Sequence, residues 1–322
     1  IIMSVTGLDA TKTIIKELLE NTSGLKVGTD FGLAYGPIQV LHEQQLETLV
    51  NKKRIVSAMD KNSLNAASSF LETITKHGVR NIGDIKTAEA VALFEVAQRD
   101  VSTALANELA IFCEEAGLDY LKAHELLKTN DYGSLPLPVL VNGKTREESY
   151  LLLEDAENLN LTLRILKTAR EANEGMIKHA INLTRDTLRN CGKSLKRARI
   201  CLLGISQTPN MKTSPKKVAK ELARMLEVKG AKVSLHDPYF SAGELIEMRH
   251  AFKKNLTEAV EGADCIIVMT GHDQFRRLNL KKLKVMMKTP AAIIDFEGAL
   301  EPDNVEKEGF IYRGLGRGVW TK

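Results

Sequence analysis

The feature that most constrains the fold is a regular alternation of short apolar runs and helical patterns in the last third of the chain. RICLLGI, AKVSLHDP, ADCIIVMT and AAIIDF have the length and composition of buried strands, and helical segments lie between them. Ser214 and Pro215 open the first of these helices, which we expect to run to about Lys229, because proline is well tolerated in a first helical turn. Strands that alternate with helices form parallel sheets covered by helices. From about Arg197 onwards we therefore predict a Rossmann-like α/β domain of the kind that holds a nucleotide.

The start of the chain has a shorter version of the same alternation. FGLAY, RIVSAM and NIGDI are predicted strands, and a helix is expected from Ser63 to His77. The opening residues, IIMSVTG, resemble the end of a buried strand that has lost its beginning. We therefore interpret residues 1–85 as the truncated remainder of a larger, partly Rossmann-like α/β domain.

The middle of the chain, residues 86–195, has a helical pattern. One predicted helix runs from Thr87 to about Lys128, and a second from about Arg146 to Arg189 with a break near residues 158–160. Apolar residues of the first helix recur at steps of three and four, as an amphipathic helix requires. They are Val91, Phe94, Val101, Leu105, Leu109 and Phe112. We expect this region to be a helical spacer or an association surface, followed by the third domain at 196–322.

Composition narrows the classes of function. The 322 residues are 43% hydrophobic and 27% charged, a balance typical of soluble globular proteins. A net charge of +4 suits anionic ligands such as phosphates but falls short of a nucleic-acid footprint, and the basic run from Arg276 to Lys288 has the spacing of a solvated helix face. No apolar run approaches the roughly 20 residues of a membrane span. We therefore expect a cytoplasmic protein without a membrane or nucleic-acid partner.

Four cysteines and seven histidines give little sign of metal or redox chemistry, because no CxxC pair and no histidine pair at ligand spacing occurs. Cys201 and Cys265 lie in apolar strand-like runs and Cys113 in a helical pattern, so we predict reduced core thiols. Cys191 lies outside such runs and is therefore a candidate nucleophile. The end of a long helix disfavours a thiolate there, although Lys193 would favour it, and we interpret Cys191 as structural.

The turn from Gly204 to Asn210 follows the first strand of the last domain and is the predicted ligand site. Open α/β sheets bind ligands beyond the carboxyl ends of their strands, beside helix N-termini whose N–H groups favour phosphate. The turn lacks the G-x-G-x-x-G pattern of a dinucleotide site. Asp237, which ends the second strand, either bonds a ribose hydroxyl or forms a strand-end turn with Pro238.

Two further candidates follow later strands. Thr270 and His272 come after the third strand and face the same edge, and we interpret His272 as a packing or capping residue rather than an acid or base. Arg317, in the terminal GLGRG, is a candidate phosphate clamp, because its planar fork suits bidentate contact. The alternative for Arg317 is a flexible, solvated tail.

Several strings together resemble the UDP-glucose/GDP-mannose dehydrogenase family, including its UDP-N-acetylmannosamine type. These strings are SGLKVGTDFGLAYGP, RDVSTALANELAIFCEEAGLD, LKTAREANEGM, GISQTPN, VSLHDPYF, ADCIIVMTGHDQF and YRGLGRG. They occur in the family's order and cover essentially the whole chain. Within them, the resemblance implies that Asn173 and Asn210, with Asp237 and Arg317, are substrate-binding residues.

The resemblance implies an NAD-binding leading domain, a long central helix that forms a dimer and a last domain that binds the nucleotide of a UDP-sugar. Family members oxidise a primary alcohol to a carboxylate by two hydride transfers. A cysteine thiolate traps the intermediate aldehyde, and a lysine and an asparagine one helical turn apart manage the oxyanion and the water. The remainder at 1–85 then corresponds to part of the NAD-binding domain, whose Gly-rich βαβ unit is absent from this chain.

This chain departs from the family at each catalytic position. Gly143 replaces the nucleophilic cysteine, Ala92 and Val96 replace the lysine and the asparagine, and Ile38 replaces a catalytic glutamate. Glu147, in place of an aspartate, is the one chemically similar survivor and a candidate on that ground alone. In the last domain a basic residue has become Thr208 and the following loop is shortened to residues 211–213. Groups without a reactive head cannot attack, transfer a proton or bind an oxyanion.

Three hypotheses follow. The first is a catalytically silent homologue with a nucleotide-sugar-binding or structural role, which forms a homodimer through its central helices and binds no cofactor by itself. The second is an active NAD-dependent UDP-sugar 6-dehydrogenase whose NAD-binding domain is supplied from outside this chain. The third is an interaction subunit of a larger assembly. We favour the first, because the losses at positions 38, 92, 96 and 143 coincide.

Overall fold

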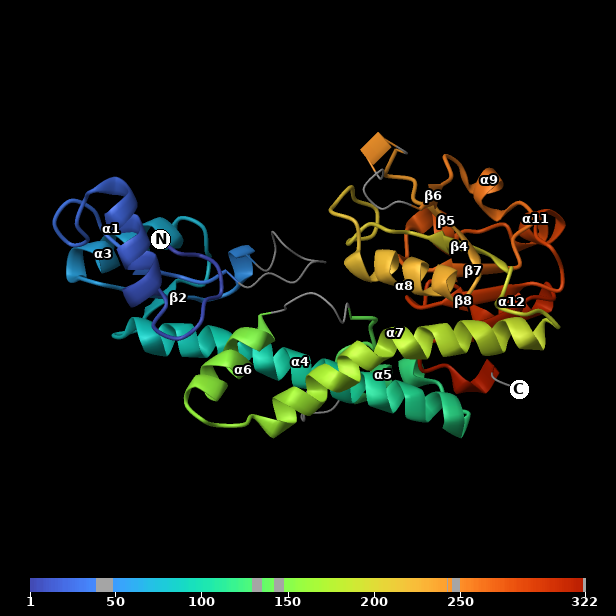
Figure 1. Cartoon of the computed structure of the whole chain (residues 1–322), viewed down its shortest axis with the longest axis horizontal. Helices are drawn as coiled ribbons and strands as arrows, with labels where there is room; N and C mark the ends of the chain where they lie inside the picture. Colours follow the sequence, from blue (N-terminus) through green and yellow to red (C-terminus); the bar gives the residue numbers. More distant parts are fainter. Residues whose placement is uncertain (39–48, 129–134, 142–147, 242, 245–249, 321–322) are drawn as a thin grey trace. The chain divides into compact units, whose positions relative to one another are not determined.

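The computed structural model describes the chain except for residues 39–48, 129–134, 142–147, 242, 245–249 and 321–322 (Figure 1). The chain forms two compact units. The first comprises Ile1–Val101 and Arg146–Thr168, and the second comprises Ser102–Thr145 and Ala169–Lys322. The predicted division into 1–85, 86–195 and 196–322 stays a prediction.

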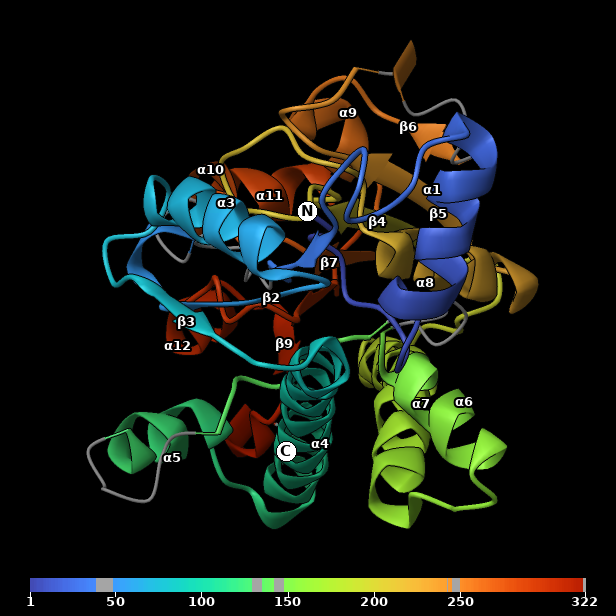
Figure 2. The same ribbon diagram turned by 90° about the vertical axis from the view of Figure 1, so that its left-hand side faces the viewer.

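A small three-stranded sheet organises the first unit. Its elements are η1 (Thr11–Ile15), α1 (Lys16–Ser23), β1 (Ala34–Tyr35), β2 (Arg54–Ala58), α3 (Lys61–Glu72) and β3 (Val79–Asn81). The strand order is β1-β2-β3, with β1 antiparallel and β3 parallel to β2. Helix α3 lies along this sheet (Figure 2), and Val56, Ala67 and Leu71 are buried between them. The expected strand-and-helix alternation is therefore present, in short elements.

The predicted strand at NIGDI is wrong over most of its length. Strand β3 ends at Asn81, and the next helix begins at Ile85. The carboxylate of Asp84 accepts a hydrogen bond from the backbone N–H of Thr87 (3.0 Å). A side-chain acceptor at this position satisfies a free N–H of the first turn and so favours a helix start.

The central region, as far as the structure describes it, has four helices: α4 (Ile85–Ala116), α5 (Tyr120–Leu127), α6 (Ser149–Asn158) and α7 (Arg164–Asn190). The prediction of one helix from Thr87 to Lys128 is wrong, because α4 and α5 are separate. Gly117 has a left-handed φ of 70°, and Asp119 caps α5 by accepting from the N–H of Leu121 (3.0 Å). The predicted break near residues 158–160 is confirmed, and Asn160 there has a φ of 58°.

Six parallel strands form the sheet of the second unit, in the order β6-β5-β4-β7-β8-β9. The strands are β4 (Arg199–Leu203), β5 (Lys232–His236), β6 (Ala251–Phe252), β7 (Cys265–Val268), β8 (Ala292–Asp295) and β9 (Ile311–Gly314). The helices are α8 (Lys217–Val228), α9 (Leu256–Val260), α10 (Asp273–Arg276), α11 (Leu280–Met286), α12 (Pro302–Lys307) and the 3-10 turn η4 (Gly318–Trp320). The predicted mixed α/β class with a Rossmann-like parallel sheet is confirmed.

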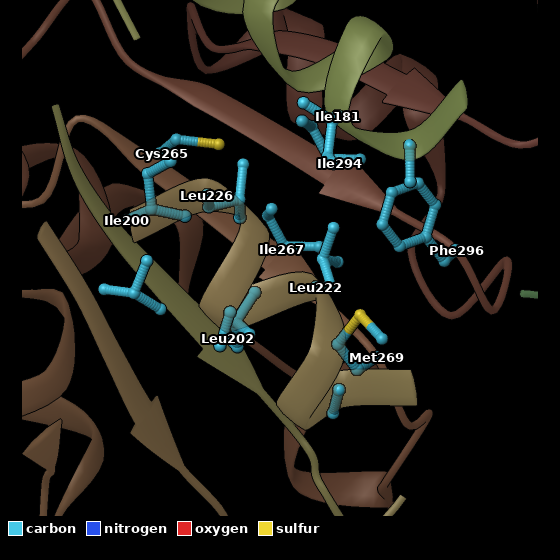
Figure 3. Close-up of a cluster of buried hydrophobic side chains, with 14 of the residues drawn as sticks. Ile181, Ile200, Leu202, Leu222, Leu226, Cys265, Ile267, Met269, Ile294 and Phe296 are labelled. Atoms are coloured by element: carbon cyan, nitrogen blue, oxygen red, sulfur yellow. The ribbon is translucent and has the colours of Figure 1, made fainter. Parts of the chain in front are cut away.

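The alternation of side chains along each strand explains the layers of the second unit. One face of the sheet packs against α7 and α8, where Leu222 and Leu226 of α8 meet strand residues such as Ile200 and Ile267 (Figure 3). The other face packs against α9 to α12 through a second apolar cluster that includes Phe275. Each fully buried aliphatic or aromatic side chain contributes about 1.5–3 kcal/mol. The sheet is therefore covered on both faces, as a parallel sheet requires.

The sequence missed two strands and misplaced one helix start. β6 has only two residues, and the sequence of β9 is IYRG, so neither is an apolar run like those of the central strands. Helix α8 begins at Lys217 rather than at Ser214, because Pro215 forms an antiparallel bridge with Ser206 and Ser214 accepts from the N–H of Gln207 (3.2 Å). Within the described residues, no helix is both long enough and apolar enough to cross a membrane.

Candidate functional site

The turn after β4 holds the predicted ligand site at the carboxyl edge of the second unit's sheet. Gly204 has a left-handed φ of 83°, and a Cβ at this position would lie 2.7 Å from the side chain and the carbonyl oxygen of Thr270. Only glycine fits such a close approach without displacing a neighbour. The Thr270 hydroxyl donates to the carbonyl oxygen of Ser206 (2.7 Å), so the ends of β4 and β7 are tied together. The predicted placement of Thr270 beside the turn is confirmed.

Asp237 fixes the same turn from the end of β5. Its Oδ2 accepts from the N–H groups of Ile205 (2.7 Å) and Ser206 (2.8 Å), and its Oδ1 accepts from the N–H of Tyr239 (2.8 Å). Burial by itself would raise the pKa of this carboxyl, but hydrogen bonds from His272, Tyr239 and Ser206 outweigh burial and hold the pKa at about 2. Both oxygens therefore serve a strand-end turn, and the role in ribose binding stays a prediction.

His272 joins Asp237 to Asn210. Its Nδ1 accepts from the backbone N–H of Asn210 (2.8 Å), and its Nε2 lies 3.1 Å from Asp237 Oδ2. This pair of contacts requires the neutral ring with its proton on Nε2, because Nδ1 must offer a lone pair. The ring is fully buried and lies against Tyr239 and Phe275. Its contacts are those of a packing residue, and as the N-cap of α10 its side chain makes no capping hydrogen bond.

Asn210 lies on the exposed rim of this network. Its φ of 58° is left-handed, which asparagine tolerates better than most residues. Its side-chain oxygen accepts from the N–H of Asp273 (2.9 Å) at the start of α10. Asn210 is thus the one member of the chain Asp237–His272–Asn210 that faces solvent, and its role in substrate binding stays a prediction.

Lys216 and Glu297 form an ion pair at this edge that the sequence did not reveal. Lys216 Nζ donates to Glu297 Oε1 and to the carbonyl oxygen of Met269, both at 2.6 Å. Asp295, at the end of β8, is buried and accepts from the N–H of Leu300 (2.7 Å). Burial raises the pKa of Asp295, although hydrogen bonds from backbone N–H groups act to lower it. The acidic end of AAIIDF was the only sequence signal for this group.

The terminal GLGRG segment is packed rather than solvated. Arg317 is 8% exposed, and its guanidinium donates to Tyr312 Oη (3.2 Å) and to Asp119 Oδ2 (3.3 Å) while it lies over the Trp320 ring. The alternative of a flexible, solvated tail is therefore wrong for Arg317, because its guanidinium is buried and is held by fixed acceptors, as a desolvated charge requires. The phosphate-clamp role of Arg317 stays a prediction, with Asp119 already paired to it. The N–H of Gly316 donates to Glu114 Oε1 (2.8 Å).

Asn173 lies in a fully buried amide pair of the second unit. Its Oδ1 accepts from Asn107 Nδ2 (2.9 Å), and Asn107 Oδ1 in turn accepts from the N–H of Val139 (2.8 Å). These contacts join α4, α7 and the segment around Val139. Buried amides are well tolerated only when hydrogen-bonded, so this pair fixes the register of the two helices. The substrate-binding role of Asn173 stays a prediction.

The positions aligned with the family's catalytic groups lie in the first unit or outside the described residues. Ala92 and Val96 lie on α4 and are 1% and 3% exposed. Ile38 is half-buried after β1. Gly143 and Glu147 lie outside the described residues. The described positions therefore carry apolar side chains, and those of Ala92 and Val96 are buried.

All four cysteines are free and buried. Burial raises the pKa of the Cys191 thiol, and the nearby Lys193 and Arg313 only partly oppose this change. Burial raises the pKa of Cys201 to about 12. The prediction of core thiols is confirmed by their burial, and the nucleophile alternative for Cys191 is disfavoured because the thiolate is the reactive form. In the described part of the chain, no three His, Cys, Asp or Glu residues come together as a metal site.

Comparison with known proteins identifies the family. A model of the central domain of the UDP-glucose/GDP-mannose dehydrogenase family matches residues 86–175, and a model of that family's UDP binding domain matches residues 201–302. A UDP-N-acetyl-D-mannosamine dehydrogenase of Pyrococcus horikoshii is 30% identical over 306 residues, which are 94% of this chain and 68% of that protein. The chain belongs to the UDP-glucose/GDP-mannose dehydrogenase family.

Other members of the family agree. A UDP-N-acetyl-D-mannosamine dehydrogenase of Methanococcus maripaludis is 27% identical and aligns with 89% of this chain and 65% of its own length. The solved structure of a UDP-D-ManNAc dehydrogenase from P. horikoshii superposes with a TM-score of 0.82 at 28% identity, over 98% of this chain and 72% of that one. An NDP-N-acetyl-D-galactosaminuronic acid dehydrogenase from Methanosarcina mazei gives 0.81 at 26% identity, over 99% and 70%. The chain thus spans about two thirds of the length of these family members.

Several of the candidate residues fall into the matches to two different domains of the family. Ala92, Val96 and Asn173 fall in the match to the central domain, and Asn210 and Asp237 fall in the match to the UDP binding domain. The relatives are named as UDP-sugar or NDP-sugar dehydrogenases. The predicted family resemblance is confirmed.

Proposed function

We propose that this chain is a catalytically silent member of its family that retains nucleotide-sugar binding and a role in assembly. The observation that carries the proposal is the pair Ala92 and Val96, buried on α4 where the family resemblance places a lysine and an asparagine. A methyl and an isopropyl group can neither transfer a proton nor donate to an oxyanion. Residues that act as a unit in catalysis lose their function together, so one such loss commonly costs orders of magnitude in rate.

The nucleotide-sugar would bind at the carboxyl edge of the second unit's sheet. Support comes from the match to the UDP binding domain at 201–302 and from the rule that open α/β sheets bind ligands at this edge. Asn210 is exposed there, whereas Lys216 is engaged with Glu297 and Lys212 with Glu244. Because these two cations are already paired with carboxylates, we expect weaker binding of UDP than in the relatives.

The first unit argues against binding of NAD by its described residues. The turn from β2 into α3 is a strand-to-helix turn of the kind that holds a pyrophosphate. Here the carboxylate of Asp60 occupies the helix N-terminus and accepts from the N–H of Ser63 (2.9 Å). A second anion would meet this carboxylate, so the turn does not fit a dinucleotide.

Association through α4 is the proposed basis of a homodimer. Leu105, Leu109 and Phe112 recur at helical spacing and are 46%, 37% and 61% exposed. Exposed large side chains gathered along one helix mark an association surface. We expect the double variant Leu109→Glu/Phe112→Glu to be monomeric in size-exclusion chromatography with light scattering, at concentrations where the unchanged chain is a dimer. A monomeric unchanged chain would contradict the dimer.

A second candidate is an active NAD-dependent UDP-sugar 6-dehydrogenase completed by a further α/β domain. The observation that favours it is the apolar surface around α1, a helix with no buried residue. Ile14, Leu18 and Leu25 there are 69%, 63% and 47% exposed. A further domain packed on this surface could restore NAD binding, but it could not restore a lysine or an asparagine at positions 92 and 96.

One set of measurements separates these candidates. The purified chain is incubated with NAD and UDP-sugars while NADH is followed by absorbance, with the P. horikoshii dehydrogenase as positive control. We expect no formation of NADH above background, and robust formation of NADH would contradict the proposal of a silent homologue. A reciprocal variant of the P. horikoshii enzyme, with Ala and Val at the positions aligned with Ala92 and Val96, should lose at least a hundredfold in rate. Near-normal rates in that variant would remove the argument from these two residues.

Calorimetry with UDP and with UDP-sugars tests the binding part independently. Heat of binding that is lost in an Asn210→Ala variant supports a retained nucleotide site. Absence of binding by the unchanged chain would leave only the assembly role. In that case, recovery of the chain with a different polypeptide from native lysate would favour an interaction subunit over a homodimer.

A further inference from the structure

The amino edge of the second unit's sheet, opposite the predicted ligand edge, concentrates the positive charge of the chain. Nine basic and four acidic residues lie in the segments 185–199, 227–232, 261–264 and 286–291, which precede β4, β5, β7 and β8. We call the nine basic residues the basic edge: Arg185, Arg189, Lys193, Lys196, Arg197, Arg199, Lys229, Lys232 and Lys288. Since the whole chain has a net charge of +4, the remainder is close to neutral.

Contacts between the starts of the strands show that the basic edge is continuous in space. Arg199 and Lys232 are register partners at the first residues of β4 and β5. The N–H of Arg197 donates to the carbonyl oxygen of Gly230 (2.7 Å), and a Cβ on Gly230 would lie 3.1 Å from the side chain of Lys196. These contacts place four cations around one pair of strand starts.

The same surface continues towards β7 and β8. Arg199 Nη1 would lie 2.8 Å from a Cβ on Gly262, in the turn before β7. Lys193 Nζ donates to the carbonyl oxygen of Lys288, and the N–H of Lys288 donates to the carbonyl oxygen of Ala263 (3.0 Å). Cations from the starts of β4, β5 and β8 therefore lie around the turn before β7, which itself carries none.

The acidic residues of this surface neutralise only part of the charge. Asp264 is buried and bound by Lys193 (2.8 Å), Asp186 pairs with Arg185 and Arg189, and Glu227 lies near His250. Glu261 is exposed. Exposed cations without an ion pair in the described part of the chain remain at several positions. They are Lys196, Arg197, Arg199, Lys229, Lys232 and Lys288. Like charges gathered in this way destabilise a fold by mutual repulsion unless an anionic partner is present.

Apolar side chains flank the basic edge. Val228, next to Lys229 at the end of α8, is 72% exposed, and Val285, near the end of α11, is 86% exposed. The carbonyl oxygen of Met286 accepts from the N–H of Gly262 (2.8 Å), which joins the end of α11 to this surface. A shallow hollow of about 410 Å³, lined by residues that include Arg185, Arg189, Lys193 and Ser194, lies at the end of α7. The edge thus combines exposed cations, a hollow and two apolar side chains.

We propose that the basic edge docks this protein on the surface of a membrane rich in anionic lipids. Clusters of four to eight exposed Lys and Arg residues bind anionic headgroups, and exposed apolar side chains beside them enter the interface. This contact needs no spanning helix. A nucleic acid fits less well, because the four segments contain no aromatic residue on which bases could stack. The proposal revises the expectation from sequence of no membrane partner, and it does not depend on the proposed function.

Vesicle flotation tests the docking. The purified chain is mixed with vesicles of phosphatidylcholine alone, or of phosphatidylcholine with 30% phosphatidylglycerol, in about 0.1 M salt. We expect flotation only with the anionic vesicles, and loss of flotation in about 0.5 M salt as charges are screened. Each basic residue near an anionic surface contributes about fivefold to partitioning, so Lys196→Glu/Lys232→Glu should weaken partitioning by about 30-fold or more.

Matched controls make the test specific. Lys52→Glu/Lys53→Glu applies the same change of charge to two exposed residues of the first unit and should leave flotation unchanged. Val285→Ser should weaken partitioning while net charge stays constant. Circular dichroism establishes that each variant is folded. Equal loss in both charge variants, flotation with neutral vesicles, or binding of a 20-nucleotide DNA without flotation would each overturn the proposal.

Discussion

The carboxylate of Asp237 gives the sharpest test of how the carboxyl edge is held together. It accepts hydrogen bonds from Ile205, Ser206 and Tyr239 while buried at 1% exposure, and its pKa is about 2. A fall from 3.8 to about 2 on folding corresponds to about 2.5 kcal/mol of stability at neutral pH. In Asp237→Asn, an NH₂ group faces some of these donors. We therefore expect a loss of about 2–3 kcal/mol at pH 7.

The pH dependence of that loss follows from the direction of the shift. Because the pKa is lower in the folded than in the unfolded chain, the stabilisation is complete above about pH 5 and is lost as the pH falls towards 2. At pH 3 about 1 kcal/mol of it should be gone, so the gap between the two proteins narrows by that amount. Urea unfolding followed by circular dichroism at pH 7 and pH 3 measures the gap.

The exposed Asp273, in the first turn of α10, provides the control. Asp273→Asn removes the same charge and should change stability by no more than about 0.5 kcal/mol. A cost of less than about 0.5 kcal/mol for Asp237→Asn at pH 7 would contradict the stabilising role of this carboxylate. An equal cost at both pH values would contradict its lowered pKa in the folded chain.

Three further predictions concern packing. Gly316→Ala should lower the free energy of unfolding by more than about 1 kcal/mol, because the φ of Gly316 is 68° and a Cβ would lie 2.6 Å from Tyr120 Cβ. Gly175→Ala, in α7 with open space around it, should raise the free energy of unfolding by up to about 1 kcal/mol. The midpoints of urea unfolding measure both changes. Leu222→Ala should cost about 2–5 kcal/mol, against less than about 0.5 for the exposed Val228→Ala, and equal costs would contradict the assigned core. A thiol reagent such as DTNB should label none of the four buried cysteines rapidly at pH 7.5 and all of them in urea, and one fast thiol in the native protein would contradict their burial.

Sequence alone predicted the parts of the fold that depend on local pattern. The four central strands of the second unit are apolar runs, and burial on both faces of a parallel sheet requires such runs. Strand β6 was missed because it has only two residues, and β9 was missed because Arg313 and Gly314 interrupt its apolar pattern. The break between α4 and α5 also has a local signal in the sequence, because Gly117 is followed two residues later by Asp119. The helical pattern of apolar residues outweighed this signal in the prediction.

The contacts that organise the candidate site could not be predicted from local pattern. Lys216 and Glu297 are 81 positions apart, and Asn107 and Asn173 are 66 apart. Side-chain partners at such separations are decided by the order of the strands and the crossing of helices. Asp237 was identified because it ends a strand, yet its acceptance of three N–H groups depends on the turn after β4.

The joint between the GLGRG segment and the start of α5 has a consequence for the order in which the protein folds. Glu114 and Gly316 are 202 positions apart, and Asp119 and Arg317 are 198 apart. During synthesis the carboxylates of Glu114 and Asp119 therefore stay exposed to water until about two hundred further residues have left the ribosome. The bend between α4 and α5 can form these contacts only after the GLGRG segment has been synthesised. A protein halted at residue 315 should therefore expose the bend to proteases, while its separately packed first unit stays resistant.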